Sequence, residues 1–249
     1  MILQKLPWAG VLIEQDSTRV LIDPIGQTTP QMELMGEPRQ PLVPLTELQG
    51  VAAVLITHLH DDHFDAASIK SAYGADIPVF VPERSARYAE KSGLTNVIGV
   101  REGDSHEIGS LTVTATHSMD GFGFPQVSYV VEGGGKRVLH SGDTIWHGYW
   151  WKIAKYHRPD VVCLPCNGPL CDYPDFAPSH LVPAALTPEQ AVEAAHVLQA
   201  GTLVPIHYDT FYLEPYYVQA PDLLPRLQSH ASARGVNLHV MQTHDQLIV

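Results

Sequence analysis

The six residues His58-Leu59-His60-Asp61-Asp62-His63 constrain what this chain can fold into more than any other stretch. They follow residues 51–57, an apolar run whose length and β-branched content predict a buried strand. Imidazoles and carboxylates crowded at the end of a buried strand are unfavourable unless a cation lies between them, and a divalent metal is the usual cation. The stretch therefore predicts a metal site at a strand end.

The composition is that of a globular protein. The chain has 249 residues, of which 45% are hydrophobic and 17% are charged, which excludes a disordered chain. We see no internal repeat and no linker, so we expect one α/β domain over residues 1–249.

The charge of the chain limits the classes of partner that it is expected to bind. The formal net charge is −12, with 15 Lys and Arg and no basic run, which argues against nucleic acid or an anionic membrane surface as the main partner. No apolar run is long enough to span a membrane, and no leader pattern opens the sequence. We therefore expect a cytoplasmic protein with a small-molecule substrate, and whether it forms a homo-oligomer stays open.

The three cysteines lie close together, at positions 163, 166 and 171. An odd number of clustered cysteines is unlike a secreted disulfide framework. Cys163 and Cys166 resemble a zinc or redox pair in spacing, but thiols beside a buried strand more often serve as small hydrophobic side chains.

Apolar periodicity and turn residues predict mixed strands and helices. Two hairpins are expected, residues 10–14 with 19–23 and residues 127–131 with 136–140. Thr187 and Gln190 form a capping box that opens a helix closed by Gly201. Further strands are expected at 78–81, 111–117, 161–164, 202–206, 238–241 and 246–249, further helices at 65–73, 83–92 and 223–234, and long proline-rich loops at 24–44 and 165–188.

Several of these strands end in a side chain that binds metals. Strand ends that meet at one edge are where α/β sheets build sites. Seven N or O ligands are too many for one tetrahedral zinc, and they suit two ions about 3.5–4 Å apart, bridged by a carboxylate and a water whose pKa falls toward ~7. The candidate ligands are His58, His60, Asp62, His63, His117, Asp143 and His207.

The order and spacing of these residues resemble the metallo-β-lactamase superfamily. Residues 10–14, 20–24, 187–191 and 205–211 resemble the branch that contains ascorbate-6-phosphate lactonase and related uncharacterised metal-dependent hydrolases. The resemblance implies a four-layer αββα sandwich. It also implies a first ion on His58, His60 and His117, a second on Asp62, His63 and His207, Asp143 as the bridge, and Asp23 as a support.

The function implied is that of a metal-dependent hydrolase. A hydroxide bound by the two ions would attack a small ester or lactone, with Asp62 and Asp143 as the catalytic carboxylates. A phosphodiesterase or phosphomonoesterase on the same ions and a non-catalytic metal-binding module are the alternatives. Zinc is the expected ion, then manganese, and iron or nickel also suit these ligands.

Three aromatic residues are candidate substrate contacts. Phe122 lies in the loop after His117, Trp146 opens an aromatic stretch after Asp143, and Tyr208 follows His207. Packing on the core is the alternative for each of them. His140, although it precedes Asp143 on the same strand, is expected to be structural.

Overall fold

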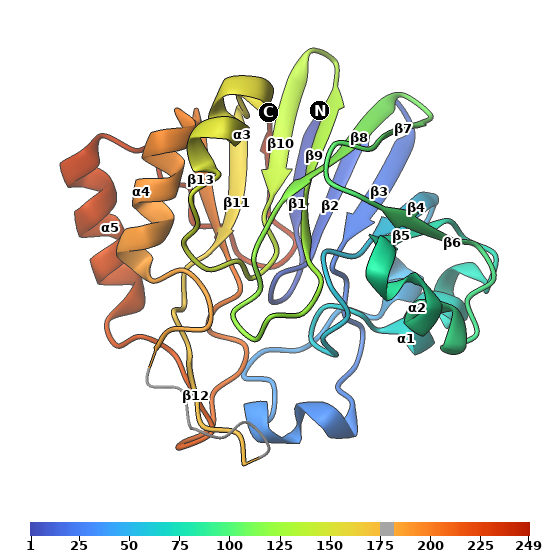
Figure 1. Cartoon of the computed structure of the whole chain (residues 1–249), viewed down its shortest axis with the longest axis horizontal. Coiled ribbons are helices and arrows are strands. Elements are labelled where there is room, and N and C mark those ends of the chain that lie inside the picture. The colour runs from blue at the N-terminus through green and yellow to red at the C-terminus, as the bar shows by residue number, and fades with distance from the viewer. Residues whose placement is uncertain (175–181) are drawn as a thin grey trace.

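The computed structural model describes residues 1–174 and 182–249 as two sheets packed face to face, with helices on their outer faces (Figure 1). The first sheet has the strand order β15-β1-β2-β3-β4-β5-β6 and the second β13-β11-β10-β9-β8-β7. The strands of the first sheet are β1 (Ile2–Lys5), β2 (Val11–Gln15), β3 (Thr18–Ile22), β4 (Val51–Leu55), β5 (Val79–Pro82), β6 (Val97–Val100) and β15 (Gln246–Ile248).

The second sheet carries the strands from the middle of the chain. They are β7 (Ser105–Ile108), β8 (Leu111–His117), β9 (Val127–Gly133), β10 (Lys136–His140), β11 (Val161–Pro165) and β13 (Thr202–Ile206). A separate short pair joins β12 (Leu170–Cys171) to β14 (Tyr217–Val218).

Helices cover both outer faces. On the first sheet lie α1 (Ala66–Tyr73) and α2 (Ala86–Lys91), and on the second lie α3 (Trp150–His157), α4 (Pro188–Leu198) and α5 (Leu223–Arg234) (Figure 1). Short 3-10 helices occupy Pro30–Met35, Leu45–Glu47 and Glu83–Ser85. The four-layer αββα arrangement predicted from the sequence is confirmed.

The alternation of side chains along each strand explains the layers. On β2, Val11 and Ile13 pack between the two sheets, whereas Leu12 packs in a second cluster that includes Ile69 of α1. The strands of the second sheet alternate in the same way between the central cluster and one that contains α3, α4 and α5. Because both faces of each sheet are covered, the strands are apolar on both sides.

Most of the predicted elements are present. Asp65 begins α1 by accepting a hydrogen bond from the Ser68 N–H at 2.9 Å, and Thr187 and Gln190 form the capping box of α4. Both hairpins and the helix at 223–234 are also confirmed. Leu238 forms only an isolated bridge, so the strand predicted at 238–241 is wrong.

Other differences lie at short or atypical segments. The sequence did not predict β1, β6, β7, α3, β12 or β14. The predicted 24–44 loop contains a 3-10 helix, and a 3-10 turn precedes α2 within the predicted helix at 83–92. Residues 175–181 of the predicted 165–188 loop lie outside the described residues.

The three cysteines are buried and unpaired. Burial raises the pKa of Cys163 to about 12, so its thiol stays protonated. Cys163 packs between the two sheets, which agrees with the role of a small hydrophobic side chain. In the described parts of the chain no helix has both the length and the apolar character that crossing a membrane requires.

Candidate metal centre

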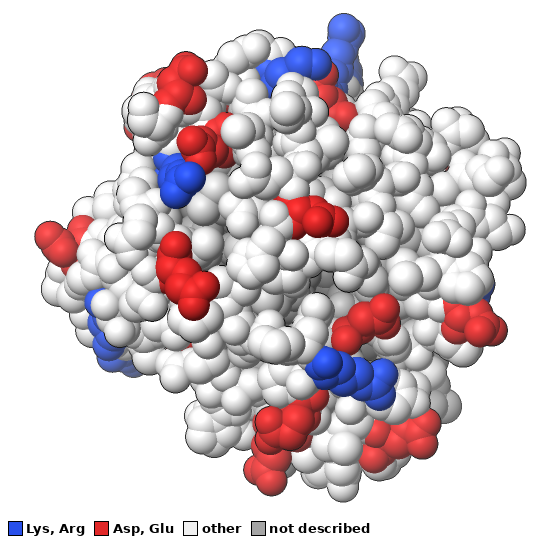
Figure 2. Space-filling model, turned by 180° about the vertical axis from the view of Figure 1, so that it is seen from behind, with Lys and Arg blue, Asp and Glu red and all other residues white. Residues whose placement is uncertain are grey.

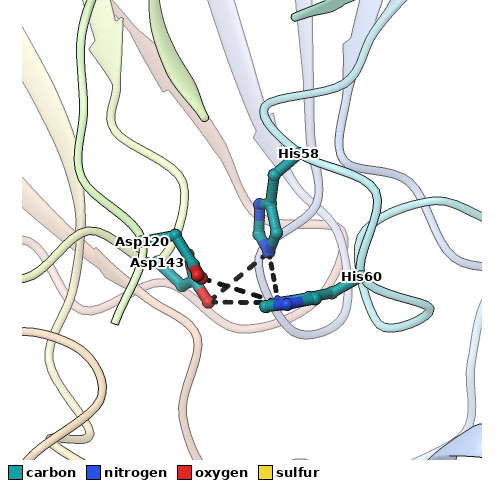
Figure 3. A group of neighbouring side chains, drawn as sticks. All are labelled: His58, His60, Asp120 and Asp143. Atoms are coloured by element: carbon teal, nitrogen blue, oxygen red, sulfur yellow. Dashed lines mark hydrogen bonds and ion pairs between the residues drawn. The ribbon is translucent and has the colours of Figure 1, made fainter. Parts of the chain in front are cut away.

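Loops that leave several strands at one end of the sandwich bring two groups of donor atoms together. In the first group, His58 and His60 follow β4, Asp120 follows β8 and Asp143 follows β10 (Figure 3). His58 Nε2 lies 3.5 Å from Asp143 Oδ2, and His60 Nδ1 lies 3.7 Å from Asp120 Oδ1. The four side chains point at a common centre, with their donor atoms within 4.8 Å of one another.

The second group consists of Asp62, His63 and His207. Asp62 Oδ2 lies 3.5 Å from His63 Nε2 and 3.4 Å from His207 Nε2. The two groups adjoin, because the ring centroids of His58 and His63 are 4.2 Å apart. The arrangement offers places for two neighbouring ions.

The pattern of hydrogen bonds fits a metal at each group. Asp120 Oδ1, His63 Nε2 and His207 Nε2 are buried and have no hydrogen-bond partner. A buried polar atom without a partner costs about 1–3 kcal/mol. These orphaned atoms are the ones that point into the two groups, so a divalent ion in each would satisfy them.

The electrostatics of the centre also call for a cation. Burial raises the pKa of the Asp143 carboxyl well above its usual range, and the nearby carboxylates Asp120, Asp62 and Asp23 raise it further against the effect of His63. Burial likewise lowers the pKa of His58 well below its usual range, so this imidazole is neutral, which is the form that binds a metal; its Nε2 lies 2.8 Å from His60 Nδ1. A cation between the carboxylates would remove their mutual repulsion.

Asp23, at the end of β3, holds the second group from behind. Its Oδ1 accepts a hydrogen bond from the Thr57 N–H, and its Oδ2 lies 2.8 Å from His63 Nδ1. This contact leaves His63 Nε2 facing the centre, which is how a supporting carboxylate orients a metal-binding histidine. The sequence predicted this supporting role for Asp23.

Trp8 and Asn167 hold Asp62 and His207 of the second group in place, and the sequence did not predict either residue. The Trp8 indole N–H donates to Asp62 Oδ2 at 2.9 Å, and its ring centroid lies 4.0 Å from that of His207. Asn167 Oδ1 lies 3.1 Å from His207 Nδ1. Asn167 follows the end of β11, which was an available signal, whereas Trp8 sits in a tight turn that carried none.

His140 faces away from both groups. Its Nε2 lies 2.8 Å from the Ala9 carbonyl oxygen, and its Nδ1 accepts from the Gly142 N–H at 3.2 Å. These bonds tie β10 to the β1–β2 turn, which agrees with the structural role expected from the sequence.

A cavity of about 530 Å³ opens onto the centre. It lies within the size range of small-molecule sites, about 300–1,000 Å³. No Lys or Arg stands among its described lining residues, which are Gln31, Met32, Leu34, Met35, Leu59, His60, Asp61, Asp62, Phe122, Phe124, Asp143, Pro169, Cys171, Tyr173, Pro174, Ala184, His207 and Tyr217.

Residues 18–208 match the family described as a beta-lactamase superfamily domain. This chain belongs to the metallo-β-lactamase superfamily. It is also 30% identical over 250 residues to a UPF0173 metal-dependent hydrolase from Caldivirga maquilingensis, covering 97% of this chain and 96% of the relative. The chain is thus a metal-dependent hydrolase of that superfamily.

Solved structures share the fold. An isothiocyanate hydrolase from Delia radicum gut bacteria has a TM-score of 0.78 at 19% identity, over 100% of this chain and 99% of that one. The metallo-beta-lactamase fold protein YhfI from Bacillus subtilis has a TM-score of 0.68 at 16% identity, over 97% of this chain and 91% of that one. At these identities the likeness concerns the fold alone.

Six of the seven ligands predicted from the superfamily pattern lie in the two groups, and His117 does not. Its Nδ1 lies 3.3 Å from Glu102 Oε2, and its ring stacks on Tyr149 with centroids 3.7 Å apart. Asp120, three residues later, stands in the first group instead. The sequence did not predict Asp120 as a ligand, although it lies in the same loop as the expected substrate contact Phe122.

The predicted substrate contacts divide in the same way. Phe122 lines the cavity, whereas Tyr208 and Trp146 do not. His207 has a left-handed backbone with φ of 60°, and the next side chain, Tyr208, packs in the cluster under α4 and α5. Trp146 turns toward α3, where its ring lies 6.0 Å from that of Trp150.

Proposed function

We propose that this protein hydrolyses a small, uncharged ester or lactone. The observation that carries the proposal is a cavity with two metal-binding groups at its floor and no Lys or Arg among its described lining residues. The resemblance to the lactonase branch suggests lactone chemistry, and the lack of Lys and Arg among the described lining residues disfavours a phosphorylated lactone.

The residues of the centre have distinct parts in this proposal. When bound, two divalent ions supply a hydroxide at neutral pH and polarise the substrate carbonyl. Asp143 would be the carboxylate shared by the two ions, since its Oδ2 lies 3.5 Å from His58 Nε2 in the first group and its carboxyl also interacts electrostatically with His63 in the second. Asp62 Oδ2 accepts from Trp8 and faces His63 and His207, so we assign Asp62 to holding the second ion.

The walls of the cavity select the substrate. Met32 and Met35, from the 3-10 helix at 30–35, stand among the lining residues with Phe122 and Phe124 from the loop after β8. Apolar area removed from water contributes roughly 25 cal/mol per Å², so these side chains favour an alkyl or aryl group on the substrate. The ring of Phe124 lies 4.5 Å from that of His60. A substrate substituent packed on Phe124 would therefore lie beside the first group of metal ligands.

A phosphoester substrate is the alternative, and the charges disfavour it. Recognition of a phosphate uses Arg or Lys. Lys152, the first basic residue after Asp143 in the sequence, pairs with Glu102 at 2.9 Å and does not line the cavity. On the face shown in Figure 2, Lys and Arg are few and scattered, with no basic patch.

The test compares neutral substrates with phosphoesters, and all of them except the lactone release p-nitrophenol. The metal-loaded protein should hydrolyse p-nitrophenyl butyrate and a neutral aryl lactone at least tenfold faster than p-nitrophenyl phosphate and bis(p-nitrophenyl) phosphate, in kcat/KM.

The control is Asp143→Ala, which removes the bridging carboxylate. Its kcat/KM toward the neutral substrates should fall by at least about a hundredfold. Faster turnover of the phosphoesters, or equal rates for the wild type and Asp143→Ala, would contradict the proposal.

A further inference from the structure

Asp120 is built to present a single oxygen to the first group. It is 4% exposed, and its Oδ2 accepts hydrogen bonds from the Phe122 and Phe124 N–H groups at 2.8 Å each. Its Oδ1 has no hydrogen-bond partner and lies 3.7 Å from His60 Nδ1. The loop thus fixes the carboxylate so that its free oxygen points at the centre (Figure 3).

His117 lies outside the first group in the observed arrangement, although its Nε2 is buried and has no hydrogen-bond partner among the described residues. Its ring is held between Tyr149, on which it stacks, and Glu102, which also pairs with Lys152. Neither ring nitrogen joins the donor atoms of the first group. The first group therefore offers two imidazoles and two carboxylates.

The second group also combines two imidazoles with carboxylate. It offers two imidazoles and the Asp62 carboxylate, and Asp143 lies close enough to act on His63. Each ion would be held by two histidines and one carboxylate of its own, with Asp143 shared between them. Two histidines with a carboxylate and open positions are typical of non-haem iron(II) sites, and added carboxylate also suits manganese, whereas imidazole in place of carboxylate moves a site toward zinc.

We propose that Asp120 sets the metal preference of this centre toward iron(II) or manganese(II) and away from zinc, relative to the same centre with a histidine there. The proposal concerns the identity of the ions and holds for any substrate. It goes beyond the hydrolytic function and does not depend on it.

The test measures metal content without substrate. The chelator-stripped wild type, Asp120→His and Asp120→Glu are dialysed anaerobically against equimolar iron(II), manganese(II) and zinc, and bound metal is read by mass spectrometry. Asp120→His should raise the ratio of zinc to iron plus manganese by about tenfold, and Asp120→Glu, which keeps a carboxylate, should leave it near the wild-type value.

The matched control is His117→Gln, which removes the nearby histidine outside the group. It should leave the metal ratio unchanged. An unchanged ratio in Asp120→His, or an equal shift in His117→Gln, would overturn the proposal. Far-ultraviolet circular dichroism of the stripped proteins checks folding. If Asp120→His does not fold, Asp120→Asn, which keeps the size of the side chain and removes its charge, takes its place and should also raise the ratio of zinc to iron plus manganese. If Asp120→His shows the expected rise in zinc but the wild type hydrolyses neither ester nor lactone, the proposed function is wrong and the proposal about Asp120 stands.

Discussion

At the scale of single residues, Trp8 connects the ligands of the second group to each other. Its N–H bonds to Asp62, its ring packs on His207, and its carbonyl oxygen accepts from the His207 N–H at 3.2 Å. Trp8→Phe keeps a ring at this position but removes the donor. We predict that metal affinity at the second group falls about 10–100-fold, as is usual when a supporting hydrogen bond to a metal ligand is lost.

Chelator competition with the apo protein measures this affinity. Trp150→Phe is the matched control, because Trp150 is fully buried and its indole N–H has no hydrogen-bond partner among the described residues. It should leave metal affinity unchanged. An equal loss of affinity in both variants would show that the effect comes from packing and not from the bond to Asp62.

Six of the predicted ligands were accessible to sequence reasoning because His58, Asp143 and His207 each stand within three residues of a recognisable strand end, and His60, Asp62 and His63 belong to the same short motif as His58. Asp120 was not, since the chain turns at Asp120 itself, where the Gly123 N–H bonds to the Asp120 carbonyl oxygen, and a one-dimensional pattern does not show which polar side chain of this loop faces the centre. Trp8 was missed for a similar reason, because its backbone lies in the left-handed region with φ of 59°.

Lys5 gives a pH dependence of stability at this same scale. Burial lowers the pKa of Lys5 from 10.5 to about 7, against the opposing effect of the nearby thiols of Cys163 and Cys166. The unfolded chain keeps this proton up to about pH 10.5, so between pH 7 and pH 10.5 the unfolded state binds more protons and stability rises with pH. Below about pH 7 both states are protonated and the dependence ends.

The comparison variant is Lys5→Met. The free energy of unfolding of the wild type, minus that of Lys5→Met, should increase from pH 7 to pH 9 by up to about 1.4 kcal/mol per pH unit. Urea unfolding of both stripped proteins at several pH values measures it. Parallel curves for the two proteins would mean that Lys5 keeps an ordinary pKa in the folded state.

At the scale of elements, the capping box of α4 is the clearest case of local sequence fixing structure. Thr187 Oγ1 accepts from the Gln190 N–H at 3.3 Å, and Gln190 Oε1 accepts from the Thr187 N–H at 3.1 Å. Thr187→Ala should lower the free energy of unfolding by about 1 kcal/mol, whereas Thr187→Ser should lower it by less than half as much. Thermal or urea unfolding compares the two, and equal losses would place the effect in the methyl group.

Elements with a clear local pattern, such as apolar alternation, a turn or a helix cap, were predicted, and elements without such a pattern were not. The hairpin of β9 and β10 has alternating apolar residues around a glycine turn, and α1 has Asp65 as its cap. By contrast, β7 is an edge strand with the sequence Ser-His-Glu-Ile, and β6 contains Gly99. Their pairing with β8 and β5 makes them strands, and that pairing is a tertiary effect.

At the scale of the whole molecule, the sandwich fold brings residues that are far apart in the sequence together at one centre. Residues from position 8 to position 207 meet at the end of the two sheets where β3, β4, β8, β10 and β13 terminate. The cavity above the centre depends on loops whose path the sequence did not predict, so of the three expected substrate contacts Phe122 lines the cavity and Trp146 and Tyr208 do not. The cytoplasmic location and the oligomeric state stay predictions.

The most direct test of the account is a crystal structure of the metal-loaded protein with anomalous scattering recorded at the iron, manganese and zinc edges. We expect two anomalous peaks, one among His58, His60, Asp120 and Asp143 and one among Asp62, His63 and His207. A single peak, no peak, or a first ion bound by His117 with Asp120 turned away would contradict it.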